Sequence, residues 1–258
     1  MQKGYGQYCP IAKGAEIFAE RWTPLIIRNL HVGAHTFSEI AAGCPRISST
    51  LLTQRLQGLE RAGVIERHPN RGAKGSLYYL TAAGQELVDV AIQLGNWGAR
   101  WLELAPEDYD PFVVLWAWKM HVVLDRLPQP RIVIGFDLRD RPMQKFWLLL
   151  QAPEPELCIK YPGYEEDLVI TTDSRTLTLV HLGRLPLSDA ERQGAWRVDG
   201  SPALVRGMPT WGGLYSRFAA LGSVNTPKGS EKTRVHAIVP PEHRGRWQSE
   251  RIPPTIPN

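Results

Sequence analysis

Small hydroxyl and amide side chains are concentrated between Ser48 and Gln57. Serine, threonine and glutamine each donate and accept hydrogen bonds. Glutamine can pair with adenine through two hydrogen bonds and the threonine methyl group can pack on thymine, so these residue types suit the reading of base edges in a DNA groove. The side chains that we expect to meet base edges are Ser49, Thr50, Thr53 and Gln54, with Ser48 beside them at the start of the segment.

Cationic side chains accompany this polar segment. Arg46 and Arg55 flank it, and Arg71 and Lys74 follow it closely in the sequence. A cation that pairs with a phosphate fixes the position of a protein on a duplex without reading its sequence. We therefore expect Arg55, Arg71 and Lys74 to contact the DNA backbone, and Arg46 to belong to the same interface. The alternative is an ordinary solvated helix, because any surface helix shows a polar face.

The polar segment belongs to a helix predicted between Ser48 and Gly63. Serine is favoured at the N-cap of a helix, and glycine commonly ends one. Leu52, Leu56 and Leu59 recur at helical spacing. A helix with this pattern buries its leucine stripe and turns its hydroxyl and amide side chains outward.

Three shorter helices are predicted before the polar segment, over Cys9–Arg21, Trp22–Leu30 and Thr36–Ala42. Thr36 and Glu39 have the spacing of a capping box, in which a threonine hydroxyl and a glutamate satisfy each other's backbone N–H groups. The third helix and the polar helix, separated by a short turn, have the arrangement of a helix-turn-helix.

A β-hairpin and a long helix are predicted after the polar segment. Strands over 64–68 and 77–80 are joined by a basic turn. The helix over 82–104 carries more apolar surface than a lone peripheral helix needs, so it requires a partner. These elements, in this order, predict a winged helix-turn-helix domain over residues 1–105.

Four segments of this first domain resemble the HxlR-type winged-helix transcriptional regulators of bacteria and archaea: Cys9–Ala12, Arg21–Leu30, Thr36–Ile40 and residues within 47–65. The resemblance implies a homodimer formed by the first helix and the helix over 82–104. It also implies a near-palindromic operator in double-stranded DNA. Two recognition helices related by a two-fold axis place half-sites about one helical turn, roughly 34 Å, apart.

Cys9 matches an N-terminal cysteine that some members of this family use as a thiol switch, so the resemblance implies a redox-sensing regulator as an alternative. Lys13 lies one helical turn away, and the start of a helix favours a thiolate. The other interpretation of Cys9 is a small buried residue under the dimer helix. Cys9, Cys44 and Cys158 are too widely spaced for a disulfide framework or a zinc finger, and we expect no metal.

Polar residues bracketed by Pro106 and Pro111 separate the first domain from a second, predicted over residues 106–222. Its mixture of strand-like and helical segments predicts an α+β fold. It contains no hydrolase elbow, metalloprotease motif, phosphate loop or dinucleotide fingerprint, so we expect no enzyme activity and no cofactor. The acidic run over 165–167 follows a Pro-Gly turn and is interpreted as a solvated loop.

The second domain is rich in large apolar side chains, most of which must form its core. Segments 136–142, 147–149, 167–177, 180–183 and 200–205 resemble the sterol carrier protein type-two-like domain that is fused behind some HxlR-type winged helices. The resemblance implies an α/β sandwich, a sheet covered by helices around an apolar tunnel, used for lipid-like ligands or for dimerisation. The residues that we expect to line such a cavity are Trp116, Phe136, Trp147, Leu149, Met208 and Trp211.

The chain has 258 residues and a formal net charge of +4. Residues 1–105 hold 11 Lys and Arg against 8 Asp and Glu, and residues 223–258 hold 6 against 3, an excess too small to establish nucleic-acid binding by itself. Residues 223–258 are predicted to be a disordered basic tail. The longest apolar run, Phe112–Trp118, is too short to cross a membrane, and residues 1–10 hold no signal core, so we expect a cytoplasmic protein.

Two functions remain open at this point. The first is a dimeric sequence-specific transcriptional regulator, preferably a repressor, whose second domain senses an apolar small molecule. Such an effector must bind one geometry of the dimer better than another. The second is a lipid-carrier module that uses its winged helix only for dimerisation or protein contacts. The basic turn and the glutamine–threonine face favour the first.

Overall fold

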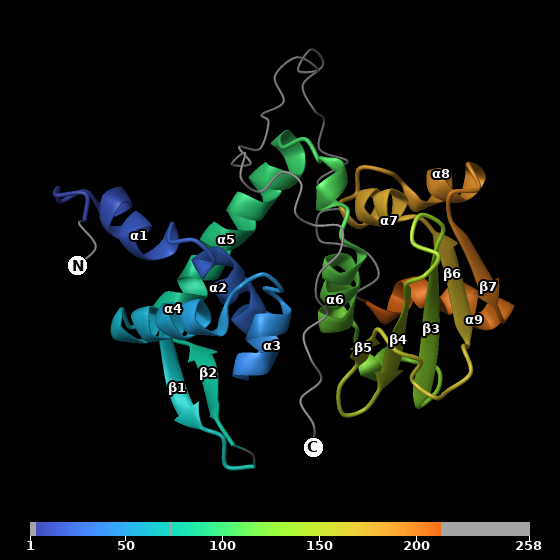
Figure 1. The fold of residues 1–258 in the computed structure, drawn as a ribbon, viewed down its shortest axis with the longest axis horizontal. Helices are drawn as coiled ribbons and strands as arrows, with labels where there is room; N and C mark the ends of the chain where they lie inside the picture. The colour runs from blue at the N-terminus through green and yellow to red at the C-terminus, as the bar shows by residue number, and fades with distance from the viewer. Residues whose placement is uncertain (1–3, 73, 213–258) are drawn as a thin grey trace.

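The computed structural model describes residues 4–72 and 74–212. The predicted tail over 223–258 lies outside the described residues. The first part of the described chain, here called the winged-helix lobe, has the predicted order of helices followed by a hairpin and a long helix (Figure 1). Its elements are α1 (Pro10–Phe18), α2 (Thr23–His31), α3 (Phe37–Ala42), α4 (Ser49–Arg61), β1 (Ile65–Pro69), β2 (Ser76–Leu80) and α5 (Ala82–Trp101).

The core of the winged-helix lobe lies between α2, α3, α4 and α5. Ile26 and Ile27 of α2 are fully buried, and Leu52 and Leu56 of α4 pack into the same cluster with Val88 of α5. Burying an aliphatic side chain of this size stabilises the fold by about 1.5–3 kcal/mol. The apolar stripe of α4 therefore holds this helix against the lobe and leaves its other face outside.

The second part of the described chain, here called the C-terminal lobe, mixes strands and helices as expected for an α+β fold. A short 3₁₀ helix, η1 (Pro106–Asp108), precedes it. Its elements are α6 (Pro111–His121), η2 (Leu124–Arg126), β3 (Arg131–Leu138), β4 (Lys145–Gln151), β5 (Glu156–Cys158), β6 (Leu168–Thr172), α7 (Ser174–His181), α8 (Leu187–Arg192), β7 (Arg197–Gly200), α9 (Pro202–Gly207) and η3 (Met208–Trp211).

The C-terminal lobe is built on a five-stranded sheet in the order β5-β4-β3-β6-β7. β3 and β6 are parallel, and the other neighbouring strands are antiparallel. Side chains alternate between the two faces of a strand. Ile134 and Phe136 of β3 and Phe146 of β4 therefore lie in one apolar cluster, while Val133 and Trp147 lie in another on the opposite face.

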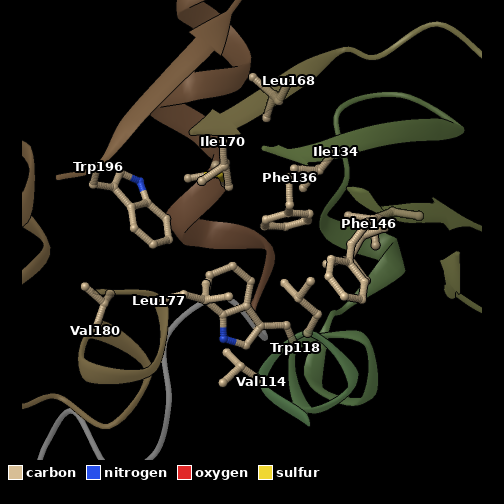
Figure 2. Close-up of a cluster of buried hydrophobic side chains, with 14 of the residues drawn as sticks. Val114, Trp118, Ile134, Phe136, Phe146, Leu168, Ile170, Leu177, Val180 and Trp196 are labelled. Carbon is tan, nitrogen blue, oxygen red and sulfur yellow. The ribbon is translucent and has the colours of Figure 1, made fainter. Parts of the chain in front are cut away.

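Helices α6 and α7 supply side chains to the larger cluster (Figure 2). The ring of Trp118 lies edge-on to Phe136 with centroids 5.9 Å apart, and it is 6.2 Å from the ring of Trp196. The indole N–H of Trp118 donates to Nδ1 of His181 at 3.1 Å, so this buried donor keeps a partner. Side chains thus fill the space between the sheet and these helices.

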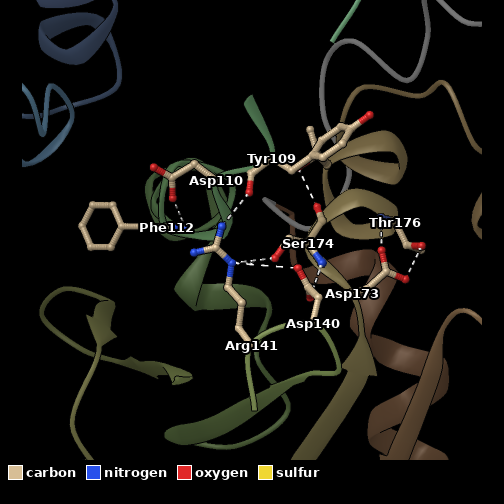
Figure 3. Close-up of polar contacts among 9 residues, drawn as sticks. Tyr109, Asp110, Phe112, Asp140, Arg141, Asp173, Ser174 and Thr176 are labelled. Atoms are coloured by element: carbon tan, nitrogen blue, oxygen red, sulfur yellow. Dashed lines mark hydrogen bonds and ion pairs between the residues drawn. The ribbon is translucent and has the colours of Figure 1, made fainter. Parts of the chain in front are cut away.

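A polar cluster fixes the chain that joins the two lobes (Figure 3). Arg141, between β3 and β4, donates to the carbonyl oxygen of Tyr109 at 3.3 Å and to Oγ of Ser174 at 3.1 Å. The carboxylate of Asp140 accepts from the backbone N–H of Ser174 at 2.9 Å. The cluster therefore ties the end of the connecting segment to the start of α7.

Helix α6 stops at His121, and the chain does not continue as a helix into η2. The backbone N–H of Val123 instead donates to the carbonyl oxygen of Trp211 at 2.8 Å. This long-range pairing draws the chain out of the helix before η2 begins.

The lobes meet where α6 packs on α2 and on the turn between α3 and α4. Trp116 of α6 is 5% exposed, and the guanidinium carbon of Arg28 lies 5.1 Å from the centre of its ring. A Cβ atom added at Gly43 would lie 2.6 Å from Trp116 and 2.4 Å from Asn29, so this close approach requires glycine. Arg28 also donates to the carbonyl oxygen of Gly43 at 2.8 Å.

A second connection joins α5 to the C-terminal lobe. Arg184, which follows α7, donates to the carbonyl oxygens of Ala99 and Leu102, at 3.0 Å and 2.6 Å respectively. The last carbonyl groups of a helix carry partial negative charge, so a cation stabilises this end of α5. Within the described ranges, no helix is long and apolar enough to cross a membrane.

Candidate nucleic-acid interface

The outer face of α4 carries hydroxyl and amide side chains. Thr50, Thr53, Gln54 and Gln57 are exposed, as is Ser49 at the start of the helix. The opposite stripe is buried, with Leu52, Leu56 and Leu59 at 0%, 2% and 3% exposure. The sequence prediction that α4 buries its leucines and exposes its polar groups is confirmed.

Two of the polar groups on α4 also bond to its own backbone. Oγ of Ser48 accepts from the backbone N–H of Leu51 at 3.2 Å, so Ser48 acts as the N-cap. The hydroxyl of Thr53 donates to the carbonyl oxygen of Ser49 at 2.9 Å, which leaves its methyl group and its oxygen lone pairs on the outer face. The hydroxyl proton of Thr53 is therefore already used within α4, and its oxygen is left to accept a hydrogen bond from a donor on DNA.

Arg55 differs from the phosphate contact predicted for it. Its guanidinium lies 2.7 Å from the carboxylate of Glu20, and its Nε donates to the carbonyl oxygen of Arg21 at 3.1 Å. The Arg55 side chain is 24% exposed. This residue braces α4 against the turn before α2, and its charge is largely compensated within the protein.

The start of α3 is fixed by the predicted capping box. The carboxylate of Glu39 accepts from the backbone N–H groups of Thr36 and His35 at 2.8 Å and 2.9 Å, while Oγ1 of Thr36 accepts from the N–H of Glu39 at 3.2 Å. Burial acts to raise the pKa of Glu39, but these hydrogen bonds and the charge of Lys119 outweigh it, so the pKa is lowered. Glu39 is therefore held as a carboxylate at neutral pH.

The hairpin of β1 and β2 forms the predicted wing beside α4. Ile65 pairs with Leu80 and Pro69 with Ser76. The backbone N–H of Tyr78 donates to the carbonyl oxygen of His35 at 2.9 Å, which fixes the hairpin against the segment that leads into α3. Near the tip, Arg71 and Lys74 are both exposed. The wing and α4 are thus held by the same small helical core.

Three exposed cations near this face did not figure in the sequence prediction. Arg61 lies in the last turn of α4, Arg67 lies on β1, and Arg21 lies in the turn before α2. Arg67 donates to Oγ of Ser76 at 2.8 Å, which orients its guanidinium on the hairpin. The helical repeat from Gln54 could have indicated Arg61. On β1 every residue after Ile65 is exposed, so no alternation along this strand singles out Arg67. Arg46, which the sequence placed in this interface, is exposed before α4.

The two helices expected to form a dimer expose large apolar side chains. Tyr8, two residues before α1, and Ile11 in its first turn are 94% and 82% exposed, and Val90, Leu94 and Trp97 of α5 are about half exposed. In Figure 1, α1 and the C-terminal half of α5 project beyond the body of the winged-helix lobe. Grouped apolar side chains of this size mark an interaction surface.

The cysteines occupy three different environments. Cys9 is half-buried at the N-cap of α1, and Lys13 pairs with Glu16 at 3.0 Å. Cys44 is buried in the turn between α3 and α4, and burial raises the pKa of its thiol. Burial also raises the pKa of Cys158 on β5. Thiolate formation is therefore disfavoured at Cys44 and Cys158.

The structure does not bring together the six residues that we expected to line one cavity. Three of them belong to the packed core, and two lie on the other face of the sheet because they alternate with core residues along β4. One, Trp116, lies between the lobes and borders a crevice there. The three core residues are Phe136, Met208 and Trp211, and the two on the other face of the sheet are Trp147 and Leu149. Over residues 4–72 and 74–212, no three His, Cys, Asp or Glu side chains are grouped to hold a metal ion.

The winged-helix lobe is similar in sequence to known proteins. Residues 17–106 match the family described as HxlR-like helix-turn-helix. The chain is 33% identical over 100 residues to the HTH-type transcriptional regulator YvaP of Bacillus subtilis, covering 38% of this chain and 92% of YvaP. It is 34% identical over 98 residues to the HTH-type transcriptional regulator YodB of the same organism, covering 37% and 87%. The structure of reduced YodB aligns with 36% of this chain and 94% of YodB, at 31% identity and a TM-score of 0.32.

Proposed function

This chain belongs to the HxlR-like helix-turn-helix family, and from that premise we propose that it is a homodimeric, sequence-specific repressor that reads double-stranded DNA with α4 and the wing. In this proposal α4 enters the major groove, where each base pair presents a distinct set of donors and acceptors. Thr50, Thr53 and Gln54 contact base edges, and Arg71 and Lys74 hold phosphates. The protein acts by occupying its operator and performs no catalysis.

The observation that carries the proposal is the division of α4 into two faces. Its leucines hold it rigidly on the lobe, and its outer face offers groups that hydrogen-bond but carry little charge. Uncharged hydrogen-bonding groups discriminate between base pairs, whereas a purely basic face would bind phosphates without preference. The exposed cations of the wing lie beside this face and supply the second type of contact.

The dimer in this proposal is formed by α1 and α5. Exposure of Ile11, Leu94 and Trp97 to water is unfavourable, and each buried Å² of apolar surface contributes about 25 cal/mol. A two-fold axis along α5 would present two copies of α4 in the same direction, which a near-palindromic operator requires.

We further propose that the C-terminal lobe is sterol-carrier-like and that it senses a small molecule. A mixed five-stranded sheet with helices packed on one face supports this assignment. The core in Figure 2 is filled with side chains, so the effector would bind elsewhere than among those ten labelled residues. The contact of Trp116 with Arg28 and Gly43 gives the lobe a direct route to the helix-turn-helix.

The test is selection of duplexes from a random library with purified full-length protein, combined with sedimentation. We expect an enriched inverted repeat with half-sites about one helical turn apart, and a dimer at micromolar concentration. Leu94→Glu should give a monomer with weaker operator binding, whereas Val113→Glu, at an exposed apolar position of α6, should remain dimeric. A wild-type monomer, or a library with no enriched sequence, would reject the proposal.

A further inference from the structure

The structure contains a crevice of about 430 Å³ between the two lobes. One wall comes from the winged-helix lobe, through Val32 after α2 and through Ser38 and Ala42 on α3. The other wall comes from the C-terminal lobe, through side chains of α6, the chain before β5, and β5 itself. Sites for drug-sized molecules have volumes of about 300–1,000 Å³, so the crevice is large enough for a compact organic ligand.

The apolar part of the crevice is lined by two aromatic and two aliphatic side chains. Phe112, Trp116 and Met120 line it from successive turns of α6, and Leu157 faces them from β5. Phe112, Met120 and Leu157 are only half-buried, so part of their apolar surface still contacts water. A planar apolar body placed between α3 and α6 would remove that surface from water.

Three charged side chains line the crevice, and two of them, Glu39 and Lys119, offset each other's charge. Lys119 of α6 acts on Glu39, whose carboxylate already accepts two backbone hydrogen bonds. Glu154, between β4 and β5, also lines the crevice and is exposed. Within the part of the chain that the structure describes, Glu154 forms no ion pair within 4.0 Å. The uncompensated charge in the lining is therefore negative and belongs to Glu154.

We propose that this crevice binds a small amphipathic organic cation, with its planar apolar body between α3 and α6 and its ammonium group at Glu154. Binding there weakens operator binding, because the ligand separates α3 from α6 at the place where Trp116 supports the turn leading into α4. The site itself needs no DNA, whereas its regulatory consequence rests on the function proposed above. The ligand is thus an effector recognised jointly by both lobes.

The test compares three probes of nearly equal shape by calorimetry: 1-naphthylmethylamine as the cation, 1-naphthylmethanol as the neutral compound and 1-naphthoate as the anion. We expect the cation to bind best and the anion worst. Glu154→Gln should weaken cation binding about fivefold and leave the neutral probe unchanged, because a partly exposed ion pair contributes up to about that factor. Glu156→Gln, two residues away and outside the lining, is the matched control and should change neither affinity.

A second variant tests the position independently of charge. Ala42→Trp, at an exposed position of α3, should fill the crevice and abolish binding of all three probes while thermal unfolding stays unchanged. Equal binding of the three probes, or cation binding that survives both Glu154→Gln and Ala42→Trp, would overturn the proposed site.

Operator affinity measured with and without the saturating cation tests the consequence. We expect a loss of at least fivefold in wild type and no loss in Ala42→Trp. Protein that binds operator but no probe would reject the crevice site and leave the proposed function intact. Protein that binds the cation but no duplex would support the site and reject the proposed function. Cation binding with unchanged operator affinity would overturn the regulatory part of the inference.

Discussion

The guanidinium of Arg28 in α2 lies over the indole ring of Trp116 in α6, 5.1 Å from its centre. This pair is one contact through which the C-terminal lobe touches the helix-turn-helix, and Arg28 also donates to the carbonyl oxygen of Gly43. A cation and an aromatic face that are both shielded from water attract each other more strongly than an exposed pair. The pair therefore provides a direct measure of coupling between the lobes.

A double-mutant cycle with Arg28→Met and Trp116→Leu should give a coupling energy of about 2 kcal/mol in urea unfolding. The matched exposed pair is Arg131 and Tyr164, whose guanidinium and ring are 3.9 Å apart. A cycle with Arg131→Met and Tyr164→Leu should give only about 0.5 kcal/mol. Equal coupling in both cycles would show that the Arg28–Trp116 contact does not hold the lobes together.

Replacing Thr50 and Gln54 with alanine should relax the sequence preference of the protein. Each good base contact contributes about 1–3 kcal/mol of discrimination, so the ratio of operator to random-duplex affinity should fall by that amount per lost contact. Competition binding measured by fluorescence anisotropy gives this ratio. Gln144→Ala, at an exposed turn of the C-terminal lobe, is the control. Unaltered selectivity in the double variant would remove both residues from base readout.

Removing a wing cation should weaken binding to every sequence alike. Arg71→Ala or Lys74→Ala should reduce the slope of log K against log salt concentration by about 0.9, the value for one phosphate contact on B-DNA. Lys160→Ala, an exposed cation in the C-terminal lobe, should keep the wild-type slope. If the slope stays the same in both wing variants, the hairpin tip lies off the DNA.

Acidification should destabilise the C-terminal lobe through His181. Burial, and then the charge of His121, lower the pKa of His181 from 6.5 to about 4. In the unfolded chain the His181 imidazole binds a proton below about pH 6.5, whereas in the folded chain it binds one only below about pH 4. The folding stability present above pH 6.5 is therefore lost as the pH falls from 6.5 to 4. The loss amounts to about 3 kcal/mol at most.

Urea unfolding of wild type and His181→Gln at pH 7 and pH 4.5 measures this contribution. The variant should lose less stability on acidification than wild type, because glutamine keeps a polar group near Trp118 without titrating. His68→Gln, at an exposed position of the wing, should behave as wild type. A variant that loses as much stability as wild type would assign the pH dependence to other groups.

Cys9→Ser should make operator binding insensitive to peroxide if Cys9 is a thiol switch. The raised pKa values of Cys44 and Cys158 disfavour thiolates there, which leaves Cys9 as the expected site of oxidation. Anisotropy titrations before and after peroxide treatment report the effect, and Cys158→Ser should respond as wild type does. Full sensitivity in the Cys9→Ser variant would place any redox response elsewhere.

The local signals of the winged-helix lobe were sufficient to predict its elements. The capping box of Thr36 and Glu39, the N-cap Ser48 and the leucine stripe of α4 each depend on residues within one or two turns, and all are present. Helix ends were predicted less well. α1 ends at Phe18 rather than Arg21, because Trp22 takes a left-handed conformation with φ of 81° as the N-cap of α2.

Features that depend on distant partners could not be predicted from periodicity. The salt bridge of Arg55 with Glu20 removes a predicted phosphate contact, and no local pattern signals it. The expected cavity residues were chosen for their bulk, but the alternation along β4 places Trp147 and Leu149 on the face opposite the main core cluster. The contact of Trp116 with Gly43 joins segments far apart in the chain and becomes visible only when both lobes are folded.

The three hydrogen bonds from Arg184 to the carbonyl oxygens of Ala99 and Leu102, at the end of α5, have a mechanical consequence. α5 begins directly after the wing strand β2 and ends where Arg184 binds its last carbonyl groups. The helix therefore connects the hairpin at one end to the C-terminal lobe at the other. In a dimer built on α5, a rotation of either lobe would turn its helix about the two-fold axis. The separation of the two wings on DNA would then depend on the orientation of the C-terminal lobes.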